Sequence, residues 1–324
     1  MKRRSLLAAL AAGWLPLPAS AQTAALPRIG FLDPSTTSSS RERVQQFRNG
    51  LKVLGYQEQR HYVLEYRSAE GSFEKLPGLA DELVRLPARV IVARNTPGTG
   101  AARGATRTIP IVMADVGDPL ALGFVSSMSR PGGNVTGLSN STIELLRKRL
   151  DVLRELQPGL KRVAVLSNAN DPNTPLQLAE IAQAAKSLRL ETRVFDAGSM
   201  EALPAMLKAV SAWKPGGALP LAQPLRPAMT PSMVQWSIRD RIPVIFAAHE
   251  DTRVGGLLSY AADLSDQYLR VAVYVDRLLK GANPADLPIE RPTRLVLSIN
   301  LKTARAMRVD VPRSLLVRAD EVIQ

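Results

Sequence analysis

The chain contains no cysteine and only two histidines, His61 and His249, which lie far apart in its 324 residues. Without cysteine there can be no disulfide framework, no thiolate nucleophile and no cysteine-ligated metal cluster. Two distant histidines also argue against a histidine-rich zinc site, a zinc-protease helix of the HExxH type and a Ser-His catalytic pair. We therefore expect no catalytic residue, no metal and no cofactor.

Aromatic residues are scarce, at 5% of the chain, whereas 42 Lys and Arg face only 29 Asp and Glu. A net charge of +13 is typical of proteins that bind nucleic acids or membrane surfaces. However, the charges are interleaved, as in the Arg-Lys-Arg-Leu-Asp run at 147–151, and the few aromatic residues provide no stacking platform for bases. We interpret the excess as a solvated basic surface and expect no nucleic-acid partner.

The first 21 residues have the pattern of a secretory signal peptide. The Lys-Arg-Arg head at 2–4 precedes an uncharged run over 5–17, and the Ala-Ser-Ala sequence at 19–21 has the small-x-small form of a cleavage site. The run is shorter than the roughly 20 residues that span a bilayer. The alternative, a buried N-terminal helix, would have no polar face. The signal-peptide pattern therefore predicts cleavage after Ala21.

Cleavage there would remove three basic residues and leave a net charge of +10. Because no cysteine follows the cleavage site, we expect no lipid anchor and a mature protein free in the bacterial periplasm. The paired arginines at 3–4 leave the general and the twin-arginine export routes both open.

Short apolar runs alternate with helical hydrophobic patterns along the mature chain. For example, RIGFL at 28–32 predicts a strand, and Val44, Phe47 and Leu51 recur at the spacing of one helix face. Further strands are predicted at 62–66, 90–93, 109–113, 162–166, 191–195, 218–221 and 243–246, with helices between them. A turn cluster at 131–134 separates two such arrays. The alternation predicts an α/β protein with two lobes of mainly parallel sheet.

In parallel sheets, ligands bind beyond the carboxyl ends of the strands, close to helix N-termini that favour anionic groups. This rule selects six loops, at 33–36, 94–97, 115–118, 167–174, 222–223 and 248–251. The alternative for their polar residues is helix capping, which applies to Ser35, Asp118, Asn173 and Asp251. Six such loops that belong to two facing lobes favour a binding site.

The segment Gly98–Gly104 follows a predicted strand and opens a helix, as a dinucleotide-binding turn does. Its spacing is GxGxxxG instead of GxGxxG, and it follows the third strand instead of the first. We therefore favour close approach to a small ligand or simple helix packing, and no nucleotide cofactor.

Several strings, in a fixed order, identify a family. They are GLKVLGY at 50–56, YRSAEG at 66–71, IPIV at 109–112, GDP at 117–119, RPGGNVTG at 130–137, GGLLSY at 255–260, LKGANPADLP at 279–288, NLKTA at 300–304 and PRSLLVRADE at 312–321. Together they resemble the ABC-transporter substrate-binding family that includes tryptophan- and phenylalanine-binding lipoproteins. The resemblance extends over residues 27–324.

The resemblance implies a type I periplasmic binding protein: two Rossmann-like lobes with parallel sheets, joined by a hinge of three chain crossings. The first lobe would contain residues 22–138 and 262–288, and the second 139–261 and 289–324. The crossings would lie near 134–139, 256–262 and 289–295. The lobes would close over a small solute.

The resemblance also assigns candidate ligand-binding residues to the loops. Thr96 would belong to the polar-group loop of the first lobe, Asp118 to the loop after its fourth strand, and Asn170–Asn173 to the facing loop. The full set is Ser35, Thr36, Asn95, Thr96, Asp118, Ser139, Asn170, Asp171, Gln223, Glu250 and Tyr260. Amino-acid binders of the family often carry Asp where this chain has Gln223, so a natural partner for an ammonium group is lost here. The expected ligand is a small polar organic solute, amino-acid-like or a related carboxylate or aromatic compound.

Three functions compete. The resemblance implies a monomeric solute-binding component of an ABC importer, with a membrane permease and its ATPase as partners. A periplasmic sensory protein that presents its solute to a receptor is the alternative. An enzyme would need an acid–base pair, for which His249 with Glu250 or Asp251 is the one candidate, and we interpret these residues as a capping cluster.

Overall fold

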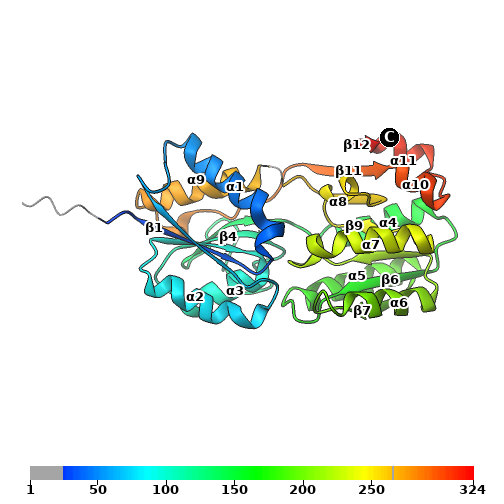
Figure 1. Ribbon diagram of the computed structural model, residues 1–324, viewed down its shortest axis with the longest axis horizontal. Helices are drawn as coiled ribbons and strands as arrows, with labels where there is room; N and C mark the ends of the chain where they lie inside the picture. Colours follow the sequence, from blue (N-terminus) through cyan, green and yellow to red (C-terminus); the bar gives the residue numbers. More distant parts are fainter. Residues whose placement is uncertain (1–24, 265) are drawn as a thin grey trace, which may run out of the picture.

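The computed structural model describes residues 25–264 and 266–324, which form two lobes joined by three chain crossings (Figure 1). The expected signal peptide and its cleavage site after Ala21 lie outside the described residues. Within the described part of the chain, no helix is both long enough and apolar enough to cross a membrane.

The first lobe is built on a five-stranded parallel sheet with the order β2-β1-β3-β4-β5. Its strands are β1 (Arg28–Asp33), β2 (Val63–Ser68), β3 (Val90–Arg94), β4 (Ile111–Val116) and β5 (Val135–Ser139). The helices of this lobe are α1 (Thr37–Val53), α2 (Leu76–Arg85), α3 (Asn95–Ala105) and α9 (Gln267–Leu279), with the short turns η1 (Phe73–Lys75) and η2 (Pro284–Asp286). The run at 28–32 and the helical spacing from Val44 to Leu51 thus form β1 and α1.

Side chains alternate between the two faces of this sheet, which gives it two cores. Ile29 and Phe31 pack against α1 and α9 on one face, whereas Leu32 packs against α2 and α3 on the other. Figure 1 shows these two helix pairs on opposite sides of the strands. Helices therefore cover both faces of this sheet, and the loops at its strand ends are left to form a binding site.

The second lobe contains the three-stranded sheet β7-β6-β8 and the four-stranded sheet β12-β11-β10-β9, which the Ala218–Val244 bridge joins. The strands are β6 (Arg162–Ser167), β7 (Glu191–Asp196), β8 (Gly217–Pro220), β9 (Ile245–Phe246), β10 (Leu258–Ala262), β11 (Leu295–Asn300) and β12 (Glu321–Ile323). The helices are α4 (Leu146–Leu156), α5 (Thr174–Leu188), α6 (Leu203–Trp213), α7 (Arg226–Asp240), α8 (Glu250–Arg253), α10 (Leu301–Met307) and α11 (Arg313–Arg318). Helices α6 and α7 cover one face, and α4, α5, α10 and α11 cover the other.

The chain passes between the lobes at 140–145, between the end of β10 at Ala262 and the start of α9 at Gln267, and at 287–294. The expected lobe boundaries lie at the ends of β5 and β10 and within the third crossing. The third crossing pairs with the end of β5, because Ser139 N donates to Glu290 O at 2.9 Å and Glu290 N donates to Gly137 O at 3.0 Å. The sheets are parallel as expected, with one exception: β10 and β11 are antiparallel. Strand β10 leaves the second lobe and β11 returns to it, so the two run in opposite directions.

Candidate ligand-binding site

A pocket of about 200 Å³ lies between the two lobes, at the carboxyl ends of their strands. From the first lobe it is lined by residues of α1, by the start of α3 and by the start of α9. From the second lobe it is lined by the first crossing, by α4 and by the loops that precede α5, α7 and α8. The position follows the rule that placed the candidate loops there.

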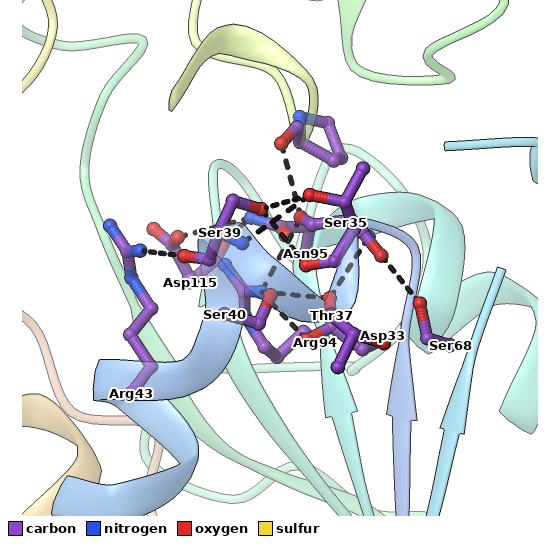
Figure 2. Close-up of polar contacts among 12 residues, drawn as sticks. Asp33, Ser35, Thr37, Ser39, Ser40, Arg43, Ser68, Arg94, Asn95 and Asp115 are labelled. Carbon is purple, nitrogen blue, oxygen red and sulfur yellow. Dashed lines mark hydrogen bonds and ion pairs between the residues drawn. The ribbon is translucent and has the colours of Figure 1, made fainter. Parts of the chain in front are cut away.

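The first-lobe wall is supported by a buried ion pair at the ends of β1 and β3 (Figure 2). Arg94 Nη1 donates to both carboxylate oxygens of Asp33, at 2.7 and 2.9 Å, and to Ser40 Oγ at 2.7 Å. Its Nε donates to Tyr268 Oη at 2.8 Å. Burial alone would lower the pKa of Arg94, but the charge of Asp33 raises it above its ordinary value. This compensated cation therefore serves as a rigid support behind the wall.

A second polar cluster joins α3, on the first-lobe wall, to the first crossing. Asp115 accepts from Asn140 Nδ2 at 2.7 Å and from Asn95 Nδ2 at 3.0 Å. Asn95 and Asp115 have φ values of 54° and 66°, in the left-handed region that Asn and Asp tolerate best. All three residues line the pocket, and the buried Oδ1 of Asn95 has no hydrogen-bond partner among the described residues.

Two more buried amides in the pocket lack partners within residues 25–264 and 266–324. Gln267, at the start of α9, is 3% exposed and neither of its amide atoms is hydrogen-bonded. Asn173, on the opposite wall, is 4% exposed and its Oδ1 is likewise unbonded. Buried polar atoms are nearly always paired, and each unpaired one costs about 1–3 kcal/mol. Acceptors on both walls, and the Gln267 amide donor on the first-lobe wall, are thus available to a bound molecule.

The second-lobe wall holds a charged cluster. Arg226 Nη1 donates to Asp251 Oδ2, and Thr230 Oγ1 donates to Asp251 Oδ1 at 2.9 Å. Asp171 is 2% exposed and accepts the backbone N–H of Asn173 at 2.9 Å. Burial raises the pKa of Asp171 to about 7, against the lowering effect of that hydrogen bond. Arg149 completes the cluster with a buried guanidinium.

The lobes touch each other around the pocket. Ser35 Oγ donates to Pro224 O at 3.0 Å across the cleft. A Cβ atom on Gly117 of the first lobe would lie 2.7 Å from Asn173 Nδ2 of the second. The lobes are therefore closed on each other, and Gly117 leaves the room that this closure needs.

Five of the eleven residues proposed from the sequence line this pocket, from both lobes. They are Asn95, Thr96, Asp171, Gln223 and Glu250. Gln223 Oε1 accepts from Asn168 Nδ2 at 2.9 Å, which holds the side chain on the second-lobe wall.

The other six lie outside the pocket lining and make local contacts. Thr36 accepts Ser39 N as the N-cap of α1, and Asp118 Oδ1 accepts Leu120 N and Ala121 N at 3.1 and 3.0 Å. Ser139 Oγ donates to Gly117 O at 3.0 Å.

Asn170 N donates to Asn168 Oδ1 at 3.0 Å, and Tyr260 packs against the core under α4. Ser35 forms the contact to Pro224 described above. The pocket lining thus does not include these six residues, and of them Ser35 connects the lobes.

Sequence reasoning missed several lining residues, above all Arg149, Arg226, Asn140 and Gln267. For one of them, Arg149, the sequence contains an indication of burial. Arg149 lies three residues after Leu146 and four before Leu153, so a cation interrupts the apolar face of its helix. The others begin helices or follow strands whose ends the sequence did not locate.

The other two candidates from the sequence, the glycine-rich segment at 98–104 and His249, occupy ordinary structural positions. The glycines at 98–104 lie inside α3, where a Cβ on Gly98 would meet Leu32 O at 3.4 Å, which fits simple helix packing. His249 precedes α8 with its Nδ1 3.8 Å from Glu250 Oε2. No group of three His, Asp or Glu within the described residues is arranged to hold a metal ion.

Comparison with known proteins agrees with this architecture. The family model described as ABC transporter substrate binding protein matches residues 29–323. The tyrosine-binding protein of Clostridioides difficile (strain R20291) is 25% identical over 264 residues, which cover 81% of this chain and 75% of that protein.

Solved structures show the same fold. An ABC domain from Streptococcus pneumonia in complex with L-Trp is 25% identical, with a TM-score of 0.83 over 92% of this chain and 100% of that one. A conserved domain protein from Vibrio cholerae is 23% identical, with a TM-score of 0.85 over 91% and 99%. The fold is that of type I periplasmic binding proteins, which confirms the predicted fold class. Because the family model covers nearly all described residues, the chain belongs to the family of ABC transporter substrate-binding proteins.

Proposed function

We propose that the protein is the exported solute-binding component of an ABC importer, which delivers a small polar organic solute to a membrane permease. The observation that carries this proposal is the set of buried, unbonded amide atoms on both pocket walls. Gln267 and Asn95 belong to the first lobe and Asn173 to the second. A solute that bonds to both walls favours the closed arrangement of the lobes through its differential contacts.

The size of the pocket limits the solute. A cavity of about 150 Å³ accommodates benzene, so a pocket of about 200 Å³ suits one ring with a short polar substituent. The relative named for tyrosine binding supports a solute of this size class, and the neighbour solved with L-Trp supports an aromatic one. We therefore propose an amino-acid-like or related aromatic compound.

The rest of the proposal concerns where and how the protein acts. It is exported by a signal peptide cleaved after Ala21, acts as a monomer in the periplasm, and catalyses no reaction. Its macromolecular partners are the permease and the ATPase of the transporter. Support comes from the signal pattern of residues 1–21 and from membership of a family of transporter binding proteins.

Native mass spectrometry of the freshly purified mature protein tests solute binding, followed by a thermal-shift panel of L-tyrosine, L-tryptophan, L-phenylalanine and benzoate. We expect a co-purified small molecule, or stabilisation by a member of the panel. Gln267→Leu should weaken that binding because it removes an amide from the pocket, whereas Gln235→Leu, on the exposed face of α7, should not. Absence of any bound or stabilising compound would contradict the proposal.

Delivery to a permease is tested separately by uptake. A strain that lacks the gene should lose uptake of the labelled solute and regain it with the wild-type gene. Unchanged uptake, together with loss of a transcriptional response to the solute, would favour the sensory alternative.

A further inference from the structure

Arg149 is a buried cation in the pocket wall whose partners are all neutral. It is 1% exposed, in the first turn of α4. Its Nε donates to the carbonyl oxygen of Tyr260 at 2.8 Å, and Nη1 and Nη2 both donate to Thr142 Oγ1 at 3.3 Å. No carboxylate among the residues that the structure describes forms an ion pair with it.

The other buried arginines of the site are arranged differently. Arg94 is paired with Asp33, and Arg226 is paired with Asp251. Asp251 is the carboxylate that acts on Arg149 electrostatically, but its oxygens are bonded to Arg226 and Thr230. A buried charge without a counter-ion is strongly unfavourable. The residues that the structure describes therefore leave the buried positive charge of Arg149 without a counter-ion at the pocket.

The guanidinium of Arg149, which lines the pocket, retains hydrogen-bonding capacity. Of its five N–H groups, the three contacts above use three. Two of those contacts are longer than the 2.7–2.9 Å typical of charge-assisted bonds. Burial, and then the charge of Arg226, lower the pKa of Arg149 to about 9, so it remains protonated at neutral pH.

We propose that Arg149 binds the carboxylate of the solute, which makes the solute an organic anion and Arg149 a specificity-determining residue. The planar guanidinium fork matches the two oxygens of a carboxylate. A matched amide would leave the buried charge uncompensated, and a matched amine would place another cation beside Arg149 and Arg226. The inference rests on the proposed function, because it assigns a substrate class to the same pocket.

The position of Arg149 also connects this charge to the hinge. Thr142 lies in the first crossing, and Tyr260 lies in β10, which leads into the second. Arg149 is thus hydrogen-bonded to the first crossing and to the strand that leads into the second. A carboxylate bound to Arg149 would be held by a side chain anchored to these two parts of the hinge.

Calorimetric titrations with matched compounds test the inference. The probes are 3-(4-hydroxyphenyl)propanoate, its amide and tyramine, then indole-3-propanoate with its amide, and benzoate with benzamide. We expect the wild-type protein to bind at least one carboxylate roughly 30-fold or more tightly than its amide, by the usual cost of removing one partner of a buried charge pair.

Variants then assign the preference to Arg149. Arg149→Gln and Arg149→Met should bind the carboxylate no better than its amide, whereas Arg149→Lys should retain part of the preference. Arg147→Gln, which changes an exposed arginine of the same helix, should behave as wild type. Removing an uncompensated buried charge should leave the melting temperature of ligand-free Arg149→Met at or above that of the wild type.

Each other outcome overturns the inference. A wild-type protein that binds amides or amines as tightly as carboxylates would still bind a solute, so the proposed function would stand and the inference would fail. Retention of the carboxylate preference in Arg149→Gln would also overturn it. If neither variant folds, the wild-type preference alone decides. Failure of every probe, with no co-purified solute, would count against both proposals.

Discussion

Buried charges in this molecule are of two kinds, according to whether the chain supplies their counter-ion. Arg94 and Arg226 are paired with carboxylates and hold loops in place. Arg149 and Asp171 are equally buried but have only neutral partners within the described residues, and both line the pocket. A charge that folding alone does not compensate is maintained at a cost in stability, which is common where a protein binds a ligand.

For Asp171, the cost of burying the charge should appear as a pH dependence of the free energy of unfolding. Burial raises its pKa in the folded protein to about 7, above the value near 4 of an unfolded chain. The folded state then binds more protons than the unfolded state between about pH 4 and 7, so stability falls as pH rises through that window. Asp171→Asn lacks this dependence. Its advantage in free energy of unfolding should grow from near zero at pH 4 to at most about 4 kcal/mol above pH 7.

Thermal and urea unfolding of ligand-free protein at several pH values provide the measurement. Asp81→Asn, at an exposed position of α2, is the matched control and should follow the wild type. A constant difference between Asp171→Asn and wild type across this range would show that the carboxyl titrates normally.

Asp118 is predicted to act on stability alone. Its carboxylate accepts two backbone N–H groups of the following turn, and it lies outside the pocket lining. Asp118→Ala should lower the free energy of unfolding by about 1 kcal/mol, the usual cost of a lost cap, and leave solute affinity within about twofold. Calorimetric titration for the affinity and urea unfolding for the stability, both on one preparation of Asp118→Ala, test this prediction. An affinity loss of roughly 30-fold without a loss of stability would place Asp118 in the site.

The sequence predicts where the site lies better than it predicts which side chains form it. The strand-end rule found the loops that carry Asn95, Asp171 and Glu250, because parallel strands end on one edge of a sheet. It could not find Gln267, because that residue lies beyond the second crossing and reaches the pocket only through the packing of α9 on the first lobe. Arg149 belongs to the run at 147–151 that we interpreted as part of a solvated surface, but it lies on the apolar face of α4 and is 1% exposed, which corrects that expectation.

Among the elements, α9 is far from the rest of the first lobe in sequence, and it belongs to that lobe because it packs on α1. The two helices approach each other closely at Gly50, where a Cβ would lie 2.7 Å from Ala272 Cβ and 3.0 Å from Leu269 Cα. Because Gln267 begins α9, this contact also sets the position of one pocket wall.

Gly50→Ala should therefore separate the helices and destabilise the protein by about 1–3 kcal/mol, as overpacking usually does. Gly78→Ala, in α2, meets nothing within 4 Å and should instead stabilise by about 0.5–1 kcal/mol through helix propensity. Equilibrium unfolding of both variants tests the pair. Equal effects of the two substitutions would contradict a close α1–α9 contact.

Long elements with clear periodicity could be predicted, whereas short ones could not. The β-branched run at 90–93 and the helical spacing from Val44 to Leu51 correspond to β3 and α1. By contrast, α8, α10 and α11 have four to seven residues, too few for a hydrophobic period to appear. The antiparallel β10–β11 pair depends on the path of the chain through the other lobe, which no local pattern records.

For the whole molecule, closure of the lobes is the property on which the function depends. The contact between Ser35 and Pro224 and the proximity of Gly117 to Asn173 define the closed arrangement. Both contacts lie between loops, so the hydrophobic cores of the lobes are independent of them.

Gly117→Ala should therefore affect closure more than folding. The added methyl group would lie 2.7 Å from Asn173 Nδ2 and prevent full approach of the loops. We expect weaker solute binding, by about tenfold, and less compaction on solute addition in small-angle X-ray scattering. Gly133→Ala, whose Cβ would meet nothing within 4 Å, is the control. Full compaction and unchanged affinity in Gly117→Ala would show that the loops close in another way.

Binding of a solute in the pocket between the lobes can be tested by calorimetric titration of a pocket-filling variant. Ala222 lines the pocket on the second-lobe wall, whereas Ala205 is exposed on α6 of the same lobe. With the tightest compound of the panel, wild type and Ala205→Trp should bind one equivalent with equal affinity, and Ala222→Trp should show no binding heat. Binding by Ala222→Trp as tight as by wild type would place the solute elsewhere and contradict the account.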